Sequence, residues 1–231
     1  MSYRQVLVTG LLLLLFAVAG TAMVAFTYQH THGRIVDNER AALLHNLHLL
    51  VPPARYDNNL FKDTIEVRDP RMLGTDDPVT VYRARKDGKP VAAVLTPVAP
   101  DGYGGAIRLL VGIDYDGTIA GVRVLSEHET PGLGDKIEAD RSDWIFGFAG
   151  KSIGNPPLDK WKVKKDGGAF DQFTGATITP RAVVKAIRKS LIYFSRHREA
   201  LFAKAGSAGG EKGAGDTGHD NGPAAAKAGK R

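Results

Sequence analysis

An uncharged stretch near the amino terminus constrains the fold of this chain more than any other feature. Residues 6–28 contain no charged side chain, and residues 11–16 within them are all strongly apolar. A helix of that length, rising 1.5 Å per residue, can cross a hydrocarbon core of about 30 Å and satisfies its own backbone polar groups there. We therefore predict a transmembrane helix over residues 6–28, preceded by a short cytoplasmic terminus at residues 1–5.

The flanking residues indicate which way this helix is oriented. Arg4 and the terminal amine favour a cytoplasmic location for the short side, which would place the rest of the chain across the membrane. A cleaved signal peptide is the alternative, because Ala17-Val18-Ala19 resembles a small-residue cleavage site. The uncharged run continues well past Ala19, which favours a retained anchor. Either alternative exports the remainder of the chain.

Composition limits what the exported part can be. We place one folded domain at residues 34–204, a length that can bury a sizeable core. The chain has no cysteine, which excludes disulfides, thiolate nucleophiles and cysteine-ligated metal or iron–sulfur sites, so redox chemistry would require another bound cofactor. The net charge is +6, but no run of five positive residues occurs, so no nucleic-acid partner is expected. Residues 205–231 lack large apolar side chains and are predicted to be a disordered tail.

Hydrophobic periodicity in the middle of the chain predicts an antiparallel sheet. The expected strands are residues 79–82, 91–95, 107–113 and 119–125, with a further edge strand at residues 161–164. Asp87-Gly88 is typical of the turn between the first two strands. Helices are expected over residues 35–50 and 140–148 and from Pro180 to about Ala203, the last capped by Thr179. The pattern indicates an α+β fold, a curved antiparallel sheet packed by helices.

Two segments stand out as candidates for chemistry. The first is Glu129-Thr130-Pro131-Gly132-Leu133-Gly134-Asp135-Lys136, and the second runs from Asp171 through Thr174-Gly175-Ala176-Thr177 to Thr179. Taken alone, each is also compatible with an ordinary tight loop or a helix-capping turn. The second segment immediately precedes a predicted helix, whose free N–H groups and partial positive charge suit a phosphate. The stretch Gly102-Tyr103-Gly104-Gly105 does not open a helix, so it is not a dinucleotide fingerprint.

The pattern Asp171-x-x-Thr174-Gly175-Ala176-Thr177 resembles the flavinylation motif of the FMN-binding domain family. With the membrane span, the following helix and the Glu129–Gly134 loop, the chain is similar throughout to the G subunits of Rnf (Rsx) electron transport complexes. The resemblance implies one FMN attached to Thr177 by a phosphoester, placed there by a dedicated FMN transferase that recognises Asp171. It also implies a bacterial inner-membrane protein with its main domain in the periplasm, alongside other Rnf subunits and the lipid bilayer.

By the same resemblance the flavin site would take in both segments. The implied cofactor-binding residues are Thr177, Thr174, Gly175, Ala176, Glu129, Thr130, Pro131, Gly132, Leu133, Gly134 and Lys136. No catalytic residue is implied, since Thr177 would be an attachment point and not a nucleophile that turns over. No metal site is expected either, because His45 and His48 are one helical turn apart without a third ligand.

The implied function is an electron relay within a translocase, an ion-translocating ferredoxin:NAD oxidoreductase. The flavin would carry the redox chemistry, and the protein would position it without independent substrate turnover. Two alternatives stay open at this point. One is the C subunit of the sodium-translocating NADH:quinone oxidoreductase, which shares both motifs. The other is a flavin-free, membrane-anchored assembly scaffold.

Overall fold

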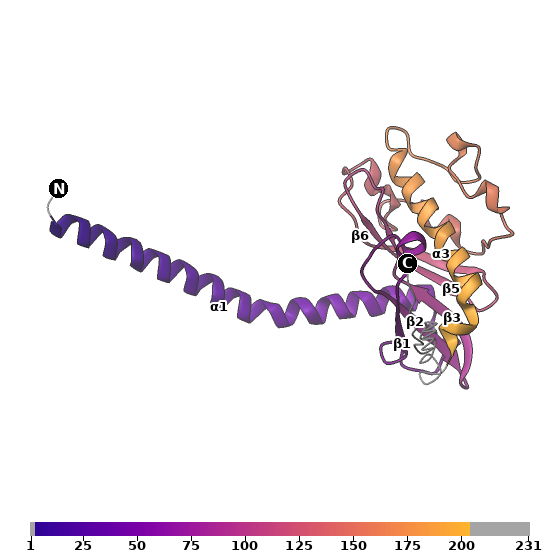
Figure 1. Cartoon of the computed structure of the whole chain (residues 1–231), viewed down its shortest axis with the longest axis horizontal. Helices are drawn as coiled ribbons and strands as arrows, with labels where there is room; N and C mark the ends of the chain where they lie inside the picture. The colour runs from indigo at the N-terminus through magenta and orange to yellow at the C-terminus, as the bar shows by residue number, and fades with distance from the viewer. Residues whose placement is uncertain (1–2, 204–231) are drawn as a thin grey trace, which may run out of the picture.

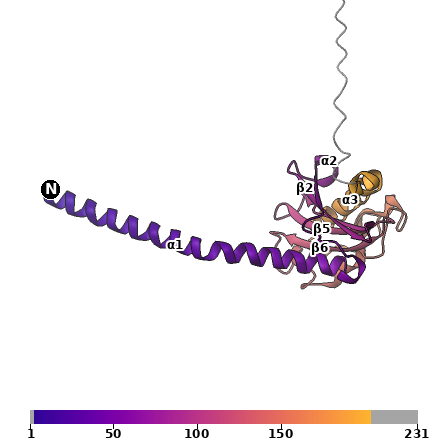
Figure 2. The same cartoon turned by 90° about the horizontal axis from the view of Figure 1, so that it is seen from below.

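The computed structural model describes residues 3–203, and the predicted tail at residues 205–231 lies outside them. The chain begins with helix α1 (Tyr3–Leu50), which runs without interruption from the amino terminus into the folded domain (Figures 1 and 2). The helix expected over residues 35–50 is confirmed as the end of α1, and it is continuous with the apolar segment before it. Residues 29–34 contain no proline, so nothing removes a backbone hydrogen bond between the two expected helices.

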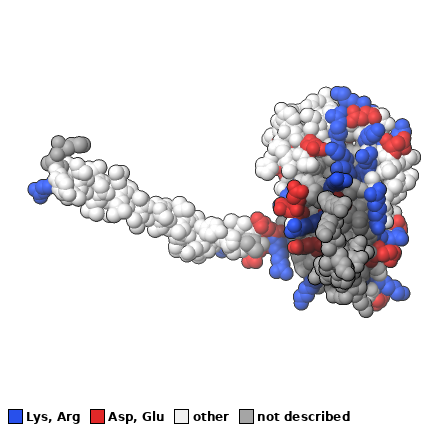
Figure 3. Space-filling model, in the orientation of Figure 1, with Lys and Arg blue, Asp and Glu red and all other residues white. Residues whose placement is uncertain are grey.

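Most of α1 projects away from the domain. The structure describes one helix that is long and apolar enough to cross a membrane, and it is this helix. Its large apolar side chains from Val6 to Tyr28 are more than half exposed, whereas Leu47 and Leu50 at its end are buried. Figure 3 shows the projecting part without charged side chains between a basic residue at its tip and the charged residues close to the domain. The composition thus changes where the helix leaves the domain.

The domain is built on one six-stranded antiparallel sheet. Its strands are β1 (Thr64–Val67), β2 (Val79–Lys86), β3 (Lys89–Leu95), β4 (Val98–Ala99), β5 (Ile107–Asp114) and β6 (Ile119–Ser126). Their order is β1-β2-β3-β5-β4, with β6 also pairing with β5. The four strands expected from periodicity are confirmed as β2, β3, β5 and β6. The turn at Asp87-Gly88 is confirmed as well, with both residues at positive φ.

The expected edge strand at residues 161–164 is wrong. Trp161 follows a short 3-10 helix, η4 (Leu158–Lys160), and only an isolated bridge joins Val163 to Phe170. Trp161 is 1% exposed and its ring lies against those of Phe148 and Phe170. Side-chain packing in an aromatic cluster, and not a strand ladder, accounts for the apolar residues here.

Helices cover the two faces of the sheet. The long helix α3 (Ile178–Phe202) packs its buried residues on one face, together with the short helices that carry Leu73, Ile137, Ile145 and Phe148. The end of α1 covers the other face, where Leu47 and Leu50 join Tyr82, Val94 and Leu110 (Figure 2). The short elements are α2 (Pro70–Leu73) and the 3-10 helices η1 (Pro53–Arg55), η2 (Gly134–Ile137), η3 (Asp143–Phe148) and η5 (Lys164–Asp166). The helix expected over residues 140–148 is confirmed as η3, in 3-10 form.

A pair of glycines seats the end of α1 on the sheet. Gly112 of β5 and Gly121 of β6 lie opposite one another in register. A Cβ atom at Gly112 would come within 3.2 Å of Leu50 Cβ, and one at Gly121 within 2.9 Å of Leu50 Cδ2. The sheet therefore has a notch that Leu50 fills, and this contact fixes where helix α1 leaves the domain.

We predict that Gly112→Val destabilises the domain by about 1–3 kcal/mol, because the added side chain overlaps the position of Leu50. Valine favours strands, so a loss of stability would come from this overlap and not from backbone propensity. Denaturant unfolding of the full chain in detergent measures the effect. Gly147→Val is the matched control, since nothing lies within 4 Å of a Cβ at Gly147. Equal losses in the two variants would contradict the seating of Leu50.

Candidate functional site

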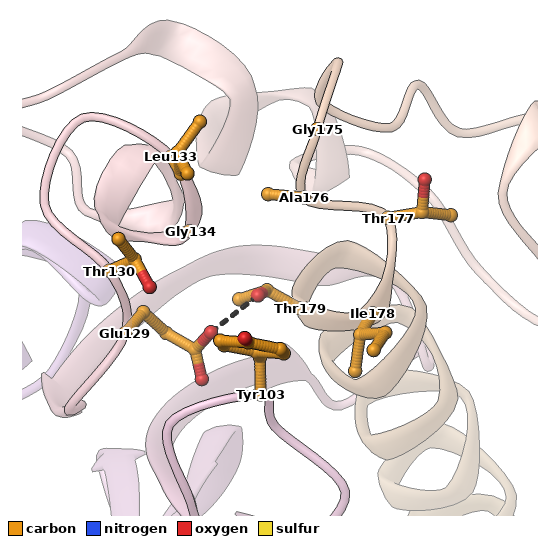
Figure 4. Close-up of a pocket in the computed structure, with 10 residues that line it drawn as sticks. All are labelled: Tyr103, Glu129, Thr130, Leu133, Gly134, Gly175, Ala176, Thr177, Ile178 and Thr179. Atoms are coloured by element: carbon orange, nitrogen blue, oxygen red, sulfur yellow. Dashed lines mark hydrogen bonds between the residues drawn. The ribbon is translucent and has the colours of Figure 1, made fainter.

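A pocket forms where two loops meet the amino-terminal end of α3 (Figure 4). One loop precedes β5 and contains Tyr103, and the other follows β6 and runs from Glu129 to Gly134. The pocket has a volume of about 290 Å³. It is lined by Tyr103, Glu129, Thr130, Leu133, Gly134, Gly175, Ala176, Thr177, Ile178 and Thr179.

Thr177 immediately precedes α3, and its hydroxyl makes no capping hydrogen bond. The prediction that Thr179 caps this helix is wrong, because the helix begins at Ile178 and Thr179 is fully buried in the first turn. Pro180 is then the third helical residue, which is tolerated because the N–H groups of the first turn have no intrahelical acceptor. The two threonines thus differ: Thr179 points inward to Glu129, while Thr177 projects from the outer side of the loop (Figure 4).

The segment before Thr177 is a tight turn. The Ala176 N–H donates to the Phe173 carbonyl at 3.1 Å, and Gly175 has a φ of 83°, which a residue with a side chain rarely adopts. A Cβ at Gly175 would lie 3.6 Å from Leu133 Cδ2, so the turn approaches the second loop closely. The motif therefore presents little side-chain bulk around the Thr177 hydroxyl.

The loop after β6 is held by its own backbone. The Thr130 carbonyl accepts hydrogen bonds from the N–H groups of Leu133 and Gly134, at 3.0 and 3.1 Å. Gly132 has a φ of 78° at the tip of this turn. Leu133, 39% exposed, extends from the loop beside the pocket, toward the side that carries the Gly175 turn. A partly exposed apolar side chain at this place offers a contact surface for a planar ring.

Glu129 joins the three parts of the site. Its side chain is buried, with 6% exposed. Its Oε1 accepts a hydrogen bond from the Gly104 N–H at 3.1 Å, and its Oε2 accepts one from the Thr179 hydroxyl at 2.5 Å. Cβ atoms at Gly102 and Gly134 would each come within 2.7 Å of one of these carboxyl oxygens. The two glycines thus leave the room that the buried carboxylate occupies, and the carboxylate in turn ties both loops to α3.

The structure brings only some of the predicted site residues to the pocket. Seven line it: Glu129, Thr130, Leu133, Gly134, Gly175, Ala176 and Thr177. Four do not, namely Thr174, Pro131, Gly132 and Lys136, which are all exposed. Pro131 and Gly132 form the tip of the loop, and Lys136 lies in η2.

Asp171 lies outside the pocket, on the approach to the turn. Its carboxylate pairs with Lys164 Nζ at 2.6 Å, and both side chains are more than half exposed. Its carbonyl accepts a hydrogen bond from the Trp144 indole N–H at 2.8 Å, and the Trp144 ring packs edge-on against Phe173. The backbone here is thus anchored by an aromatic side chain, while the Asp171 carboxylate is left accessible.

Tyr103, Ile178 and Thr179 line the pocket but are absent from the sequence-predicted site. Tyr103 is 69% exposed and stands beside Glu129 and Thr179 (Figure 4). The only feature of the sequence that could have pointed to Tyr103 is the run of glycines around it, and that run does not fit a dinucleotide-binding motif. A Cβ at Gly104 would overlap the His128 carbonyl oxygen, so this glycine allows the two loops to touch. Among the residues described, no three potential ligands gather into a metal site, and His45 and His48 are not part of one.

Comparisons with known proteins agree with this geometry. A family model for the FMN-binding domain matches residues 102–192, which include every residue that lines the pocket. A second model, for the RnfG N-terminal region, matches residues 1–50, which include all of α1.

Curated relatives extend the match to nearly the whole chain. A protein of Pseudomonas aeruginosa, named as the G subunit of an ion-translocating oxidoreductase complex, is 49% identical over 208 residues, which are 90% of this chain and 97% of that protein. Proteins of the same name from Vibrio atlanticus and Shewanella loihica are 49% and 46% identical, over 87% and 86% of this chain and 96% and 93% of theirs. The chain therefore belongs to the family of G subunits of ion-translocating oxidoreductase (Rnf) complexes, and it contains an FMN-binding domain.

Proposed function

We propose that this protein is the electron-relay subunit of a membrane-bound ferredoxin:NAD oxidoreductase complex that translocates ions, and that it carries one FMN as a phosphoester on Thr177. The observation that carries the proposal is that both candidate segments of the sequence contribute to the same pocket. Two segments about forty residues apart, each suggestive in sequence, line one pocket at the start of a helix. Family membership makes a redox complex the setting. The relatives named above are all G subunits of ion-translocating oxidoreductase complexes, which favours this proposal over the quinone-reducing sodium pump.

The residues at the pocket fit a tethered flavin. The Thr177 hydroxyl makes no capping bond, and the first N–H groups of α3 are suited to a phosphate. Tyr103, Leu133 and Ile178 offer partly exposed apolar surface for a ring system. Small-molecule pockets commonly span about 300–1,000 Å³, so a cavity of about 290 Å³ would enclose only part of an FMN.

The same features support a covalent link. No Lys or Arg is among the described residues that line the pocket, so a phosphate would lack the cationic side chains that usually hold it. A phosphoester would replace that missing affinity and would keep the cofactor in place where no free FMN could replenish it. The Thr177 hydroxyl, on the outer side of the loop, is the one a separate FMN transferase could reach.

When bound, the flavin would supply the ability to accept and release one or two electrons. The protein would orient it through the Thr177 attachment, cover part of it with the loop that carries Leu133, and exclude some water. Helix α1 would anchor the protein in the bacterial inner membrane, with Arg4 on the cytoplasmic side and the domain in the periplasm. There it would contact lipid and the other subunits of the complex.

We predict that Thr177→Ala abolishes covalent flavin while leaving the fold intact, because it removes the acceptor oxygen. Fluorescence of the denatured protein in a gel and the mass of the peptide that contains residue 177 measure attachment. Thr177→Ser, which keeps a hydroxyl, should retain the flavin. An FMN mass increment that persists in Thr177→Ala would refute the assignment.

We predict that Asp171→Asn lowers flavin incorporation at least tenfold when the protein is coexpressed with an FMN transferase, because it removes the accessible carboxylate that we expect the transferase to recognise. The ratio of flavin to protein absorbance measures incorporation. Lys164→Met is the matched control, since it breaks the ion pair at 2.6 Å but keeps the carboxylate. Equal losses in the two variants would assign the effect to the ion pair instead.

We predict that Leu133→Asp changes the absorbance spectrum of the attached flavin, because a charge replaces the apolar surface beside the pocket. Attachment at Thr177 should continue. Leu158→Asp provides a control of equal exposure, 40% against 39% for Leu133, outside the pocket. Identical spectra for wild type and Leu133→Asp would show that Leu133 does not contact the ring.

A further inference from the structure

The lining of the pocket carries a single ionisable group that is charged at neutral pH. Among the residues described, the other lining side chains are threonines, apolar residues, glycines and the phenol of Tyr103. That group is the carboxyl of Glu129, which is 6% exposed. A buried charge acts through a medium of lower effective dielectric constant than water, so its field reaches whatever occupies the pocket.

The hydrogen-bond partners of Glu129 suit a carboxylate. Both of its oxygens act as acceptors, one toward the Gly104 N–H at 3.1 Å and one toward the Thr179 hydroxyl at 2.5 Å. An ionised carboxyl is an acceptor only, whereas a protonated one must also donate. The distance to Thr179 lies in the range of hydrogen bonds from hydroxyls to charged oxygens. The two donors are neutral, so they stabilise the charge without cancelling it.

No cation neutralises this carboxylate. Within residues 3–203, no Lys, Arg or His side chain forms an ion pair with Glu129. Its own N–H is bonded to the carboxylate of Glu127, which adds a second negative charge nearby.

The surrounding segment is acidic as well. The Arg141 Nε lies 3.8 Å from a carboxylate oxygen of Asp135 and 3.9 Å from one of Glu138. The Arg141 side chain is 63% exposed. Burial raises the pKa of Glu138, and the negative charges of Glu127 and Asp135 raise it further. The positive charge of Arg141 lowers it in part. Acidic side chains thus outnumber basic ones in the segment from Glu127 to Arg141.

We propose that the Glu129 carboxylate sets the reduction potential of the flavin and holds it lower than the same pocket without this charge would. This inference rests on the proposed attachment of FMN at Thr177. Reduction adds two electrons and one proton to the flavin in mildly alkaline solution, so the ring gains one negative charge. A fixed carboxylate in the same pocket repels that charge and disfavours reduction. Glu129 also ties both loops to α3, so it keeps its own distance from the ring constant.

The test is a redox titration of the full chain in detergent at pH 8, with dithionite as reductant and mediator dyes present. Glu129→Gln keeps the size and shape of the side chain and removes the charge. We expect its flavin to be reduced about tenfold more favourably, which for a two-electron couple is a rise of about 30 mV. Glu66→Gln, an exposed glutamate on the edge strand β1, makes the same charge change at a distance and should leave the potential unchanged.

A further variant separates charge from shape. Glu129→Asp keeps the charge but shortens the side chain. It should not raise the potential. If it raises the potential as much as Glu129→Gln does, the effect is structural and the proposal fails. It also fails if Glu129→Gln, folded by circular dichroism and carrying flavin, has the wild-type potential.

The outcome can be distinguished from failure of the proposed function. The mass of the residue 177 peptide is measured first, and wild-type protein without an FMN increment would refute the attachment and not the electrostatic role. If Glu129→Gln does not fold, Thr130→Lys is used instead, since Thr130 is exposed and lines the pocket. A cation placed there should raise the potential in the same direction. An unchanged potential in that variant would overturn the proposal.

Discussion

The hydrogen bond from the Thr179 hydroxyl to the Glu129 carboxylate is the contact on which the site depends. It is 2.5 Å long and joins residues 50 positions apart, one at the start of α3 and the other after β6. Helix α3 is fixed by packing on the sheet, so this bond transfers the rigidity of the core to the loop. The second oxygen of Glu129 extends the connection to Gly104. One buried carboxylate thereby positions two loops and a helix end, and the pocket is the space among them.

The sheet could be predicted largely from sequence because β2, β3, β5 and β6 each contain several closely spaced apolar residues, which are buried under α3 on one face or under α1 on the other. The prediction of secondary structure failed where side-chain packing, and not the local sequence pattern, determines the structure. β1 and β4 have only four and two residues, too few for a detectable period. The sequence predicts a helix at each end of α1, but the change from apolar to amphipathic pattern does not indicate that the two are continuous. The aromatic residues near Trp161 carried no sign that their rings, and not their backbone, make the contacts.

At the site, the motif could be predicted from the sequence, but the different positions of its two threonines could not. Thr177 and Thr179 are chemically alike, and only the position of the helix start makes one accessible and the other buried. Pro180 suggested a helix beginning two residues later, because proline is favoured at the first helical position yet is tolerated throughout the first turn. Tyr103 could not be assigned to the site from local pattern, since its place there arises from contact between loops more than twenty residues apart. That contact is formed through Gly102 and Gly104.

The missing cations and the buried carboxylate are two parts of one electrostatic arrangement. A pocket that held FMN by non-covalent contacts would gain affinity from Arg or Lys near the phosphate, and those charges would also favour electrons arriving on the ring. A phosphoester at Thr177 makes such cations unnecessary, so the pocket can be free of them and can accommodate Glu129 without forming an ion pair. The covalent link and the low potential would then be connected. In this arrangement, covalent attachment at Thr177 allows the pocket to contain the Glu129 carboxylate, and that carboxylate lowers the reduction potential of the flavin.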